Sequence, residues 1–404
     1  MRRIAAILVL ALVATVLGGA APRTAIGDHG GREITSLFTC DRPVLPPRCT
    51  SVGDGVTHHV AFDGSLTAGL ADSLRQAMAE AYDQPTKLVM IEQSGVTRST
   101  DAIAFSDDYG ENGAAGWVYC PDGAPQGVNP RGDRWCRRQE IHFNLNPRYG
   151  LFFADDGSRD HVTCHELGHT LGLRHWGNPP QSEGEPGATC MNSNTPDGPT
   201  HLHQFDIDHI NAYPYRRVPI PPQSNGPQVP PRLLPWRGLV ATTESEPLPA
   251  TLDEMLGAAD AVVLGRISLV VPGRVFGTRH DRPLHYASAT LEVDAVLAGG
   301  LPRAHRSSLT LEIPLFDGPS SIGELPVWGE SVFLLRNKGT SAREVGLPPA
   351  RVRAESGYYR LLTFTGLVVN DEGTALTADD AGPLADLSGM RFAAAVAAIR
   401  DAGR

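Results

Sequence analysis

The sequence lacks the features that would point to nucleic acid or to a membrane. Its formal net charge is -10, and it has neither a basic stripe nor a cluster of aromatic residues, which make up only 6% of the chain. Nucleic-acid-binding proteins need positive charge to meet the phosphates, so we expect no nucleic-acid partner. No apolar run is long enough to span a bilayer comfortably, so we expect no stable membrane anchor. The negative surface favours solubility, and we expect a monomer.

The sequence has no internal repeats, and its 404 residues exceed what one hydrophobic core normally organises. We therefore expect more than one domain. Prolines recur between Val218 and Pro249, a composition typical of a semi-rigid linker and of a domain boundary. The predicted division is a signal peptide (residues 1–22), an N-terminal segment (23–52), a first folded domain (53–216), the linker (217–250) and a β-rich accessory domain (251–404).

The N-terminus predicts export from the cell. Arg2 and Arg3 precede an apolar run, Ile4–Leu17, which is followed by small residues and Pro22. A charged start, a short apolar core and a small-residue end are the parts of a secretory signal peptide. No cysteine follows the run to carry a lipid, so we expect a secreted protein.

The cysteine count agrees with export, because an even number in an exported chain favours disulfides. The six cysteines fall into three close pairs, and although fifteen connectivities are possible, we expect nearest neighbours to bond: Cys40 with Cys49, Cys120 with Cys136, and Cys164 with Cys190.

One eleven-residue stretch carries most of the chemistry, and it has the form HExxHxxGxxH from His165 to His175. On a helix, His165 and His169 project from one face and can grip a single metal ion. Gly172 can adopt a left-handed conformation, which would end the helix and bring His175 round as a third ligand. Three imidazoles suit Zn²⁺ and leave one position open for water, so the site is catalytic in type, and Glu166 completes it.

This stretch resembles the zinc signature of the metzincin metalloendopeptidases, which also carry a methionine turn downstream. Met191, in Cys190-Met191-Asn192, stands where that turn is expected. The resemblance covers about residues 50 to 215. Trp176 follows the third histidine in place of the residues that usually separate the metzincin families, so the clan is assigned and the family is not.

The resemblance implies a secreted zinc endopeptidase that acts on a protein or peptide substrate. The metal polarises a water, Glu166 acts as general base and then protonates the departing amine, and Met191 supports the site. Two alternatives stay open: a zinc hydrolase of a non-protein amide, such as a cell-wall cross-link, and a secreted binding or adhesion protein with an idle zinc site. The intact Glu166 argues against an idle site.

A second resemblance concerns latency. Pro47-Arg48-Cys49 resembles the cysteine switch of matrixin propeptides, in which a thiolate occupies the open zinc position. The residues that follow do not continue that motif, and a switch would leave Cys40 without its neighbour. We therefore favour the disulfide over the switch.

The first domain is expected to be α+β, with a metzincin-like five-stranded mixed sheet and the zinc helix. Its pattern predicts an amphipathic helix at 66–82, a closing helix at 202–213, and strands at 56–62, 87–92, 102–105, 116–120 and 140–145. The segment at 116–119 would then be the edge strand, to which an extended substrate could add by backbone pairing.

The glycine-punctuated loop from Ser106 to Gly113 carries three acids. Ca²⁺ is one interpretation, because carboxylate oxygens in a flexible loop are its usual ligands. The spacing matches no established calcium loop, so a solvated turn is favoured. The other histidines are interpreted as core or surface residues: His58, His59, His142, His161, His201 and His203.

The second domain combines a short helix at 252–259, six apolar or alternating runs and a final amphipathic helix at 390–399. This pattern predicts a small β-barrel or sandwich, and weakly suggests an OB-like barrel. It contains no chemical motif. We expect it to dock substrate or a surface, to regulate the adjacent cleft, or to act only as a stability module.

Overall fold

The computed structural model covers most of the two predicted domains. Its described residues are 52–121, 126–128, 134–173, 188–192, 196–213, 215, 243–245, 249, 251–278, 282–316, 319, 322, 325, 329–363, 366–377 and 383–403, with 126–128, 134 and 243–245 described by their backbone alone. Several predictions concern residues outside these ranges: the signal peptide, Cys40, Cys49, His175, Trp176 and most of the linker.

Six strands form the first sheet within the described ranges, in the order β2-β1-β3-β7-β4-β8. They are β1 Thr57–Phe62, β2 Val89–Gln93, β3 Ala102–Asp107, β4 Ala114–Tyr119, β7 Gln139–Asn144 and β8 Thr243–Ser245. Strands β2, β1, β3 and β7 are parallel, and β4 is antiparallel to β7. The predicted α+β class and mixed sheet are therefore confirmed. The short pair β5 (Gln126–Val128) and β6 (Arg134–Cys136) was not predicted.

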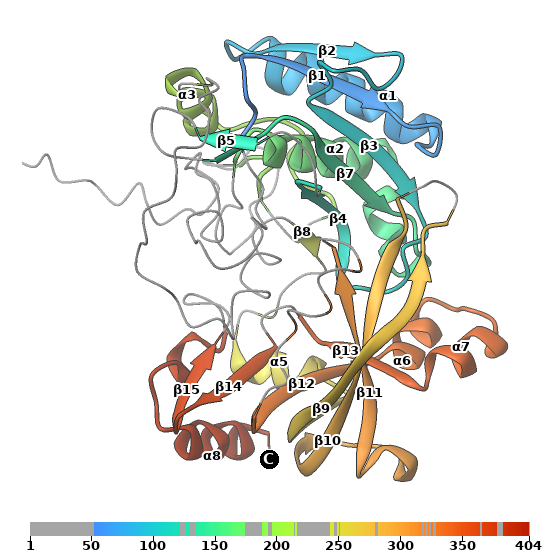
Figure 1. The fold of residues 1–404 in the computed structure, drawn as a ribbon, viewed down its shortest axis with the longest axis vertical. Helices are drawn as coiled ribbons and strands as arrows, with labels where there is room; N and C mark the ends of the chain where they lie inside the picture. Colours follow the sequence, from blue (N-terminus) through green and yellow to red (C-terminus); the bar gives the residue numbers. More distant parts are fainter. Residues whose placement is uncertain are drawn as a thin grey trace, which may run out of the picture.

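The helices α1 and α2 cover one face of this sheet (Figure 1). Helix α1 spans Ala68–Gln76 and continues as a π-helix over Ala77–Asp83, while α2 spans Asp156–Thr170. Helix α2 begins where the Asp155 side chain accepts the N–H of Ser158 at 2.8 Å. Between helices and sheet lies a core that includes Leu70, Leu74, Val162, Leu167, Val118, Ile141 and Phe143. The 3₁₀ helix Pro147–Phe153 and α3 (Gln204–Ala212) complete the domain.

Strand β4 corrects one prediction, because it is not an edge strand. Its outer side pairs antiparallel with β8, a three-residue strand from within the predicted linker. Figure 1 shows β8 beside β4. Alternation in the sequence shows that a segment is a strand but not what lies beside it, and Thr243–Ser245 contains no apolar residue that would have predicted a strand there.

The second domain is a barrel, one of the two predicted architectures. Strand β13 pairs in parallel with β11 and antiparallel with β12, which closes the ring β9-β10-β11-β13-β12. A five-stranded barrel is in keeping with the OB-like suggestion. The strands are β9 Ala261–Phe276, β10 Leu284–Gly299, β11 Ser308–Leu315, β12 Ser331–Asn337 and β13 Tyr358–Leu361. Bulges in the long β9–β10 pair let these strands bend around the barrel.

Smaller elements extend this barrel. Strands β14 (Leu367–Asp371) and β15 (Thr374–Thr377) continue the sheet from β12. Helices α5 (Leu252–Ala258) and α8 (Phe392–Ala402) pack beside them around a second small core. Helices α6 (Lys338–Glu344) and α7 (Pro349–Glu355), and the 3₁₀ helices Arg303–His305 and Ala385–Leu387, were not predicted.

The two domains share a buried junction on the sheet face opposite α2. Tyr109 and Trp117 of the first domain cluster with Tyr286 and Phe316 of the second, and the Tyr286 hydroxyl donates to the Tyr109 carbonyl at 2.8 Å. Gly277, at a φ of 71°, lies so close to Tyr109 that a Cβ there would collide with the ring. The barrel is therefore packed directly against the first domain.

The acidic loop Ser106–Gly113 lies at this junction, so its interpretation as a solvated turn was wrong. Asp107, Glu111 and Asn112 are buried, and the Arg360 guanidinium of β13 donates to Glu111 Oε1 at 2.7 Å. Asp108 accepts from the Asn146 amide at 2.9 Å. Composition indicates a polar loop but cannot show that a cation 249 residues away will cover it.

Two of the three predicted cysteine pairings are present as disulfides, Cys120–Cys136 and Cys164–Cys190. Disulfides fit a secreted protein, since they persist in oxidising compartments. Separately, none of the described helices is long and apolar enough to cross a membrane.

Candidate metal centre

Helix α2 holds three of the predicted site residues on neighbouring turns. His165, Glu166 and His169 are all 0% exposed. The two histidine rings lie nearly perpendicular, with centroids 4.6 Å apart. Their Nε2 atoms face each other at 3.0 Å, as expected for side chains four residues apart on one helix face.

Hydrogen bonds on the far side of each ring fix the position of its proton. His165 Nδ1 lies 2.8 Å from the Cys190 carbonyl oxygen, and His169 Nδ1 lies 2.7 Å from the Leu173 carbonyl oxygen. A carbonyl only accepts, so each Nδ1 donates and each neutral ring has its lone pair on Nε2. Burial lowers the pKa of His169 to about 4, so this ring is neutral at pH 7.

These two nitrogens fit a zinc ion. Two lone pairs that face each other at 3.0 Å repel unless a cation lies between them. Two imidazole nitrogens bound to one tetrahedral zinc lie about 3.3–3.4 Å apart, given the usual Zn–N distances. Metal-binding histidines also typically donate their second N–H to a carbonyl, as both rings do here.

The third predicted ligand, His175, lies outside the described residues, so the structure places only two of the three together. Within the described ranges, no group of three or more His, Cys, Asp or Glu residues could hold a metal ion. The two-histidine geometry is therefore the observation that bears on a metal.

The end of α2 has the predicted form. Gly172 adopts a φ of 91°, in the left-handed region that favours glycine. The N–H groups of Gly172 and Leu173 donate to the carbonyls of His169 and Gly168 at 3.0 and 3.1 Å, which caps the last turn. The same turn brings the Leu173 carbonyl to His169 Nδ1, so one backbone reversal ends the helix and orients a histidine.

Glu166, on the same helix as the histidine pair, lies against strand β4. Its carboxylate rests against the backbone of Gly116, where a Cβ would collide with Glu166 Oε1. Only glycine leaves room for the carboxylate at this point of the strand. The predicted general base is thus held beside the backbone of the strand predicted to align a substrate.

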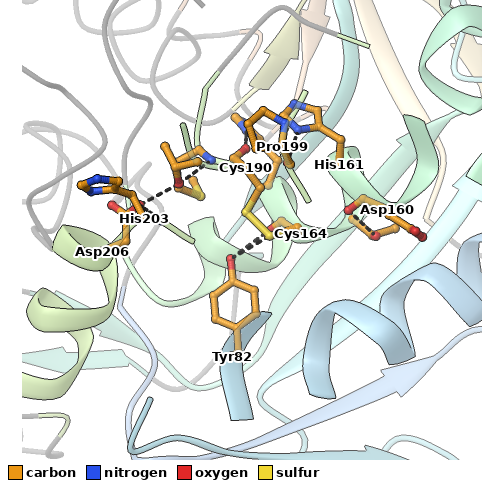
Figure 2. Close-up of a disulfide and its surroundings, with 12 residues drawn as sticks. Tyr82, Asp160, His161, Cys164, Cys190, Pro199, His203 and Asp206 are labelled. Atoms are coloured by element: carbon orange, nitrogen blue, oxygen red, sulfur yellow. Dashed lines mark hydrogen bonds between the residues drawn. A yellow bond between two sulfur atoms is a disulfide. The ribbon is translucent and has the colours of Figure 1, made fainter. Parts of the chain in front are cut away.

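Met191 lies beneath the helix, in a turn that the Cys164–Cys190 disulfide joins to α2. Met191 is 0% exposed, and a Cβ on Gly168 would collide with its sulfur. The Tyr82 hydroxyl, which also lies against Gly168, donates to the Cys164 carbonyl at 2.7 Å. Figure 2 shows Tyr82 approaching the disulfide from below, so helix and turn are fixed to one another.

A polar brace supports this turn. The Thr189 hydroxyl donates to Asp206 Oδ2 at 2.7 Å and accepts the Met191 N–H at 3.2 Å. Asp206 belongs to α3, where it also accepts the N–H of His203, the residue that caps this helix. An acidic residue three positions after the capping residue, as in a capping box, is the local signal that could have identified Asp206 from the sequence.

His161, which the sequence indicates as a core or surface residue, is 0% exposed and lies four residues before His165 on the same helix. Its ring centroid is 6.1 Å from that of His165, and its Nδ1 donates to the Pro199 carbonyl at 2.7 Å. Figure 2 shows His161 on the Pro199 side of the disulfide. His161 thus anchors the segment after the methionine turn, and the four-residue spacing was the signal that could have drawn attention to it.

His58 supports the end of α2 from strand β1. Its Nε2 lies 3.0 Å from the Thr170 hydroxyl, which itself donates to the Leu167 carbonyl at 2.7 Å. Because that hydroxyl proton is already used, His58 Nε2 must donate, and Nδ1 carries the lone pair. Burial and the neighbouring His59 lower the pKa of His58 to about 4.

No protein-family model matches this chain, and a search of curated proteins finds no significant match.

Proposed function

We propose that the chain is a secreted zinc-dependent endopeptidase of the metzincin type. One observation carries the proposal: the Nε2 atoms of His165 and His169 face each other at 3.0 Å while both Nδ1 atoms lie against carbonyl oxygens. His165 and His169 would hold the ion, and the motif supplies His175 as the third ligand. The two disulfides of the structure fit export.

When bound, zinc would polarise a water and stabilise negative charge on a carbonyl oxygen. The protein's own residues supply the rest of the chemistry. The Glu166 carboxylate accepts a proton from that water and returns it to the departing amine nitrogen. Gly116 leaves space for this carboxylate, and the tautomers of His165 and His169 are fixed by carbonyls, so little reorganisation is needed before reaction.

Cleavage of a library of quenched fluorescent decapeptides tests the proposal. We expect cleavage that 1,10-phenanthroline abolishes and that zinc restores. A cell-wall fragment with intact amide cross-links serves as the parallel substrate. Cleavage of that fragment alone would assign the site to a non-protein amide, and the absence of chelator-sensitive cleavage on either substrate would contradict a zinc hydrolase.

A further inference from the structure

Strand β8 occupies the open side of β4. The Cα partners in this pair are Ala114 with Ser245, Gly116 with Glu244, and Trp117 with Thr243, in antiparallel orientation. Strand β8 lies well after the closing helix α3 in the sequence, so a segment outside the first folded unit completes its sheet. An extended peptide that added to the sheet at this edge would need the same backbone groups of β4.

The covered position is the one next to the predicted general base. Gly116 is the residue against which the Glu166 carboxylate rests, and Gly116 is also the partner of Glu244. Cα atoms of β8 and α2 lie within 8 Å of each other. The backbone of β8 therefore runs along β4 beside the histidine helix, where a scissile peptide would have to lie.

We infer that β8 is an intramolecular cover that competes with an extended substrate for the β4 edge. This inference rests on the proposed peptidase function. In the folded chain β8 restricts the site, and displacement of β8 raises activity.

Both the shortness and the tethering of β8 suit this role. Strands usually have five or six residues, whereas β8 has three, so its pairing can be exchanged for that of a longer peptide. A segment on the same chain acts at an effective concentration on the order of millimolar, so it can exclude a dilute substrate despite its length.

The test weakens the β8 pairing through the backbone alone. Neighbouring N–H groups in a strand point to opposite sides, so the double variant Glu244→Pro/Ser245→Pro removes at least one amide that faces β4. The matched control, Glu244→Ala/Ser245→Ala, removes the same side chains and keeps both amides. Hydrogen exchange of residues 114–119 reports whether β4 is covered, and cleavage of the decapeptide library reports activity.

We expect the proline variant to exchange faster over 114–119 and to cleave peptides at least ~10-fold faster than the wild type, with the alanine variant unchanged. Equal exchange in all three proteins would overturn the inference, because β8 would not cover β4. Faster exchange with unchanged, measurable cleavage would also overturn it. If hydrogen exchange shows that β8 is released from β4 but none of the three proteins cleaves any peptide, the proposed peptidase function itself is contradicted.

A second variant tests the same point without removing a backbone amide. Ala114→Cys/Ser245→Cys places two cysteines at partnered Cα positions, where a disulfide can lock β8 onto β4. We expect the oxidised variant to lose cleavage and reductant to restore it, with the wild type in the same reductant as control. Full activity in the locked variant would overturn the inference.

Discussion

Part of the acid sensitivity should be traceable to His58, a histidine that lies outside the metal pair. His58 is 0% exposed, and its Nδ1 has no hydrogen-bond partner among the described residues, so a proton there would be buried without compensation. Its pKa is lowered to about 4 in the folded protein, against about 6.5 in the unfolded chain. The unfolded chain therefore binds an extra proton between these values, and the free energy of unfolding falls as the pH drops from 6.5 to 4.

The size of this effect follows from the pKa difference. A pKa lowered from 6.5 to about 4 corresponds to about 3 kcal/mol of unfolding free energy. Most of this free energy is lost once the pH has fallen to 4.5. His58→Gln keeps an amide that can donate to the Thr170 hydroxyl and cannot be protonated. At pH 7.5 we expect the free energy of unfolding of the variant to be only about 1 kcal/mol below that of the wild type. Between pH 7.5 and pH 4.5 this free energy should fall by about 2–3 kcal/mol less in the variant than in the wild type.

Urea denaturation at both pH values, with chelator present throughout so that metal loss does not contribute, gives the comparison. His161→Gln is a second, independent test, because burial also lowers the pKa of His161 to about 4 and its replacement should reduce the pH dependence similarly. The same pH dependence in the wild type and in His58→Gln would refute the reasoning.

Three further predictions concern the supports of the site. Replacing Cys164 and Cys190 by alanine removes a disulfide whose cysteines are 26 residues apart in the sequence, and the free energy of unfolding measured in urea should fall by about 3–4 kcal/mol. The same variant should bind zinc more weakly, whereas removal of the Cys120–Cys136 disulfide should leave the zinc affinity unchanged. Gly116→Ala puts a Cβ against the carboxylate of the predicted general base, so peptide cleavage should fall at least ~10-fold, and unchanged cleavage would contradict the placement of that carboxylate. Arg360→Leu leaves Glu111 buried without this ion-pair partner and should lower the free energy of unfolding by about 3–5 kcal/mol by calorimetry. The double variant Glu111→Leu/Arg360→Leu should lose less than the sum of the two single-variant losses, and additive losses would show that the pair is not coupled.

What the sequence could predict was local. The four-residue spacing of His165 and His169 and the glycine after them follow from helix geometry, and the structure has both on α2 with the reversal at Gly172. The strands of the first sheet other than β8 also follow from local apolar patterns. Each of these signals lies within a few residues of what it predicts.

What the sequence could not predict depends on partners far along the chain. The acidic loop is buried because Arg360 reaches Glu111 across the domain junction. Strand β4 is covered because Glu244, in a proline-rich stretch without apolar alternation, pairs with Gly116. Closure of the barrel likewise depends on β13 pairing on both of its sides. No local pattern encodes such pairings, since they are selected by tertiary packing.

A zinc peptidase in which Glu166 moves the proton is tested most directly by measuring zinc content and peptide cleavage together. Glu166→Ala should keep stoichiometric zinc and lose nearly all cleavage, because it removes the proton acceptor and leaves the histidines in place. His169→Ala should lose both zinc and cleavage. Comparable turnover by Glu166→Ala, or stoichiometric zinc in His169→Ala, would contradict the account.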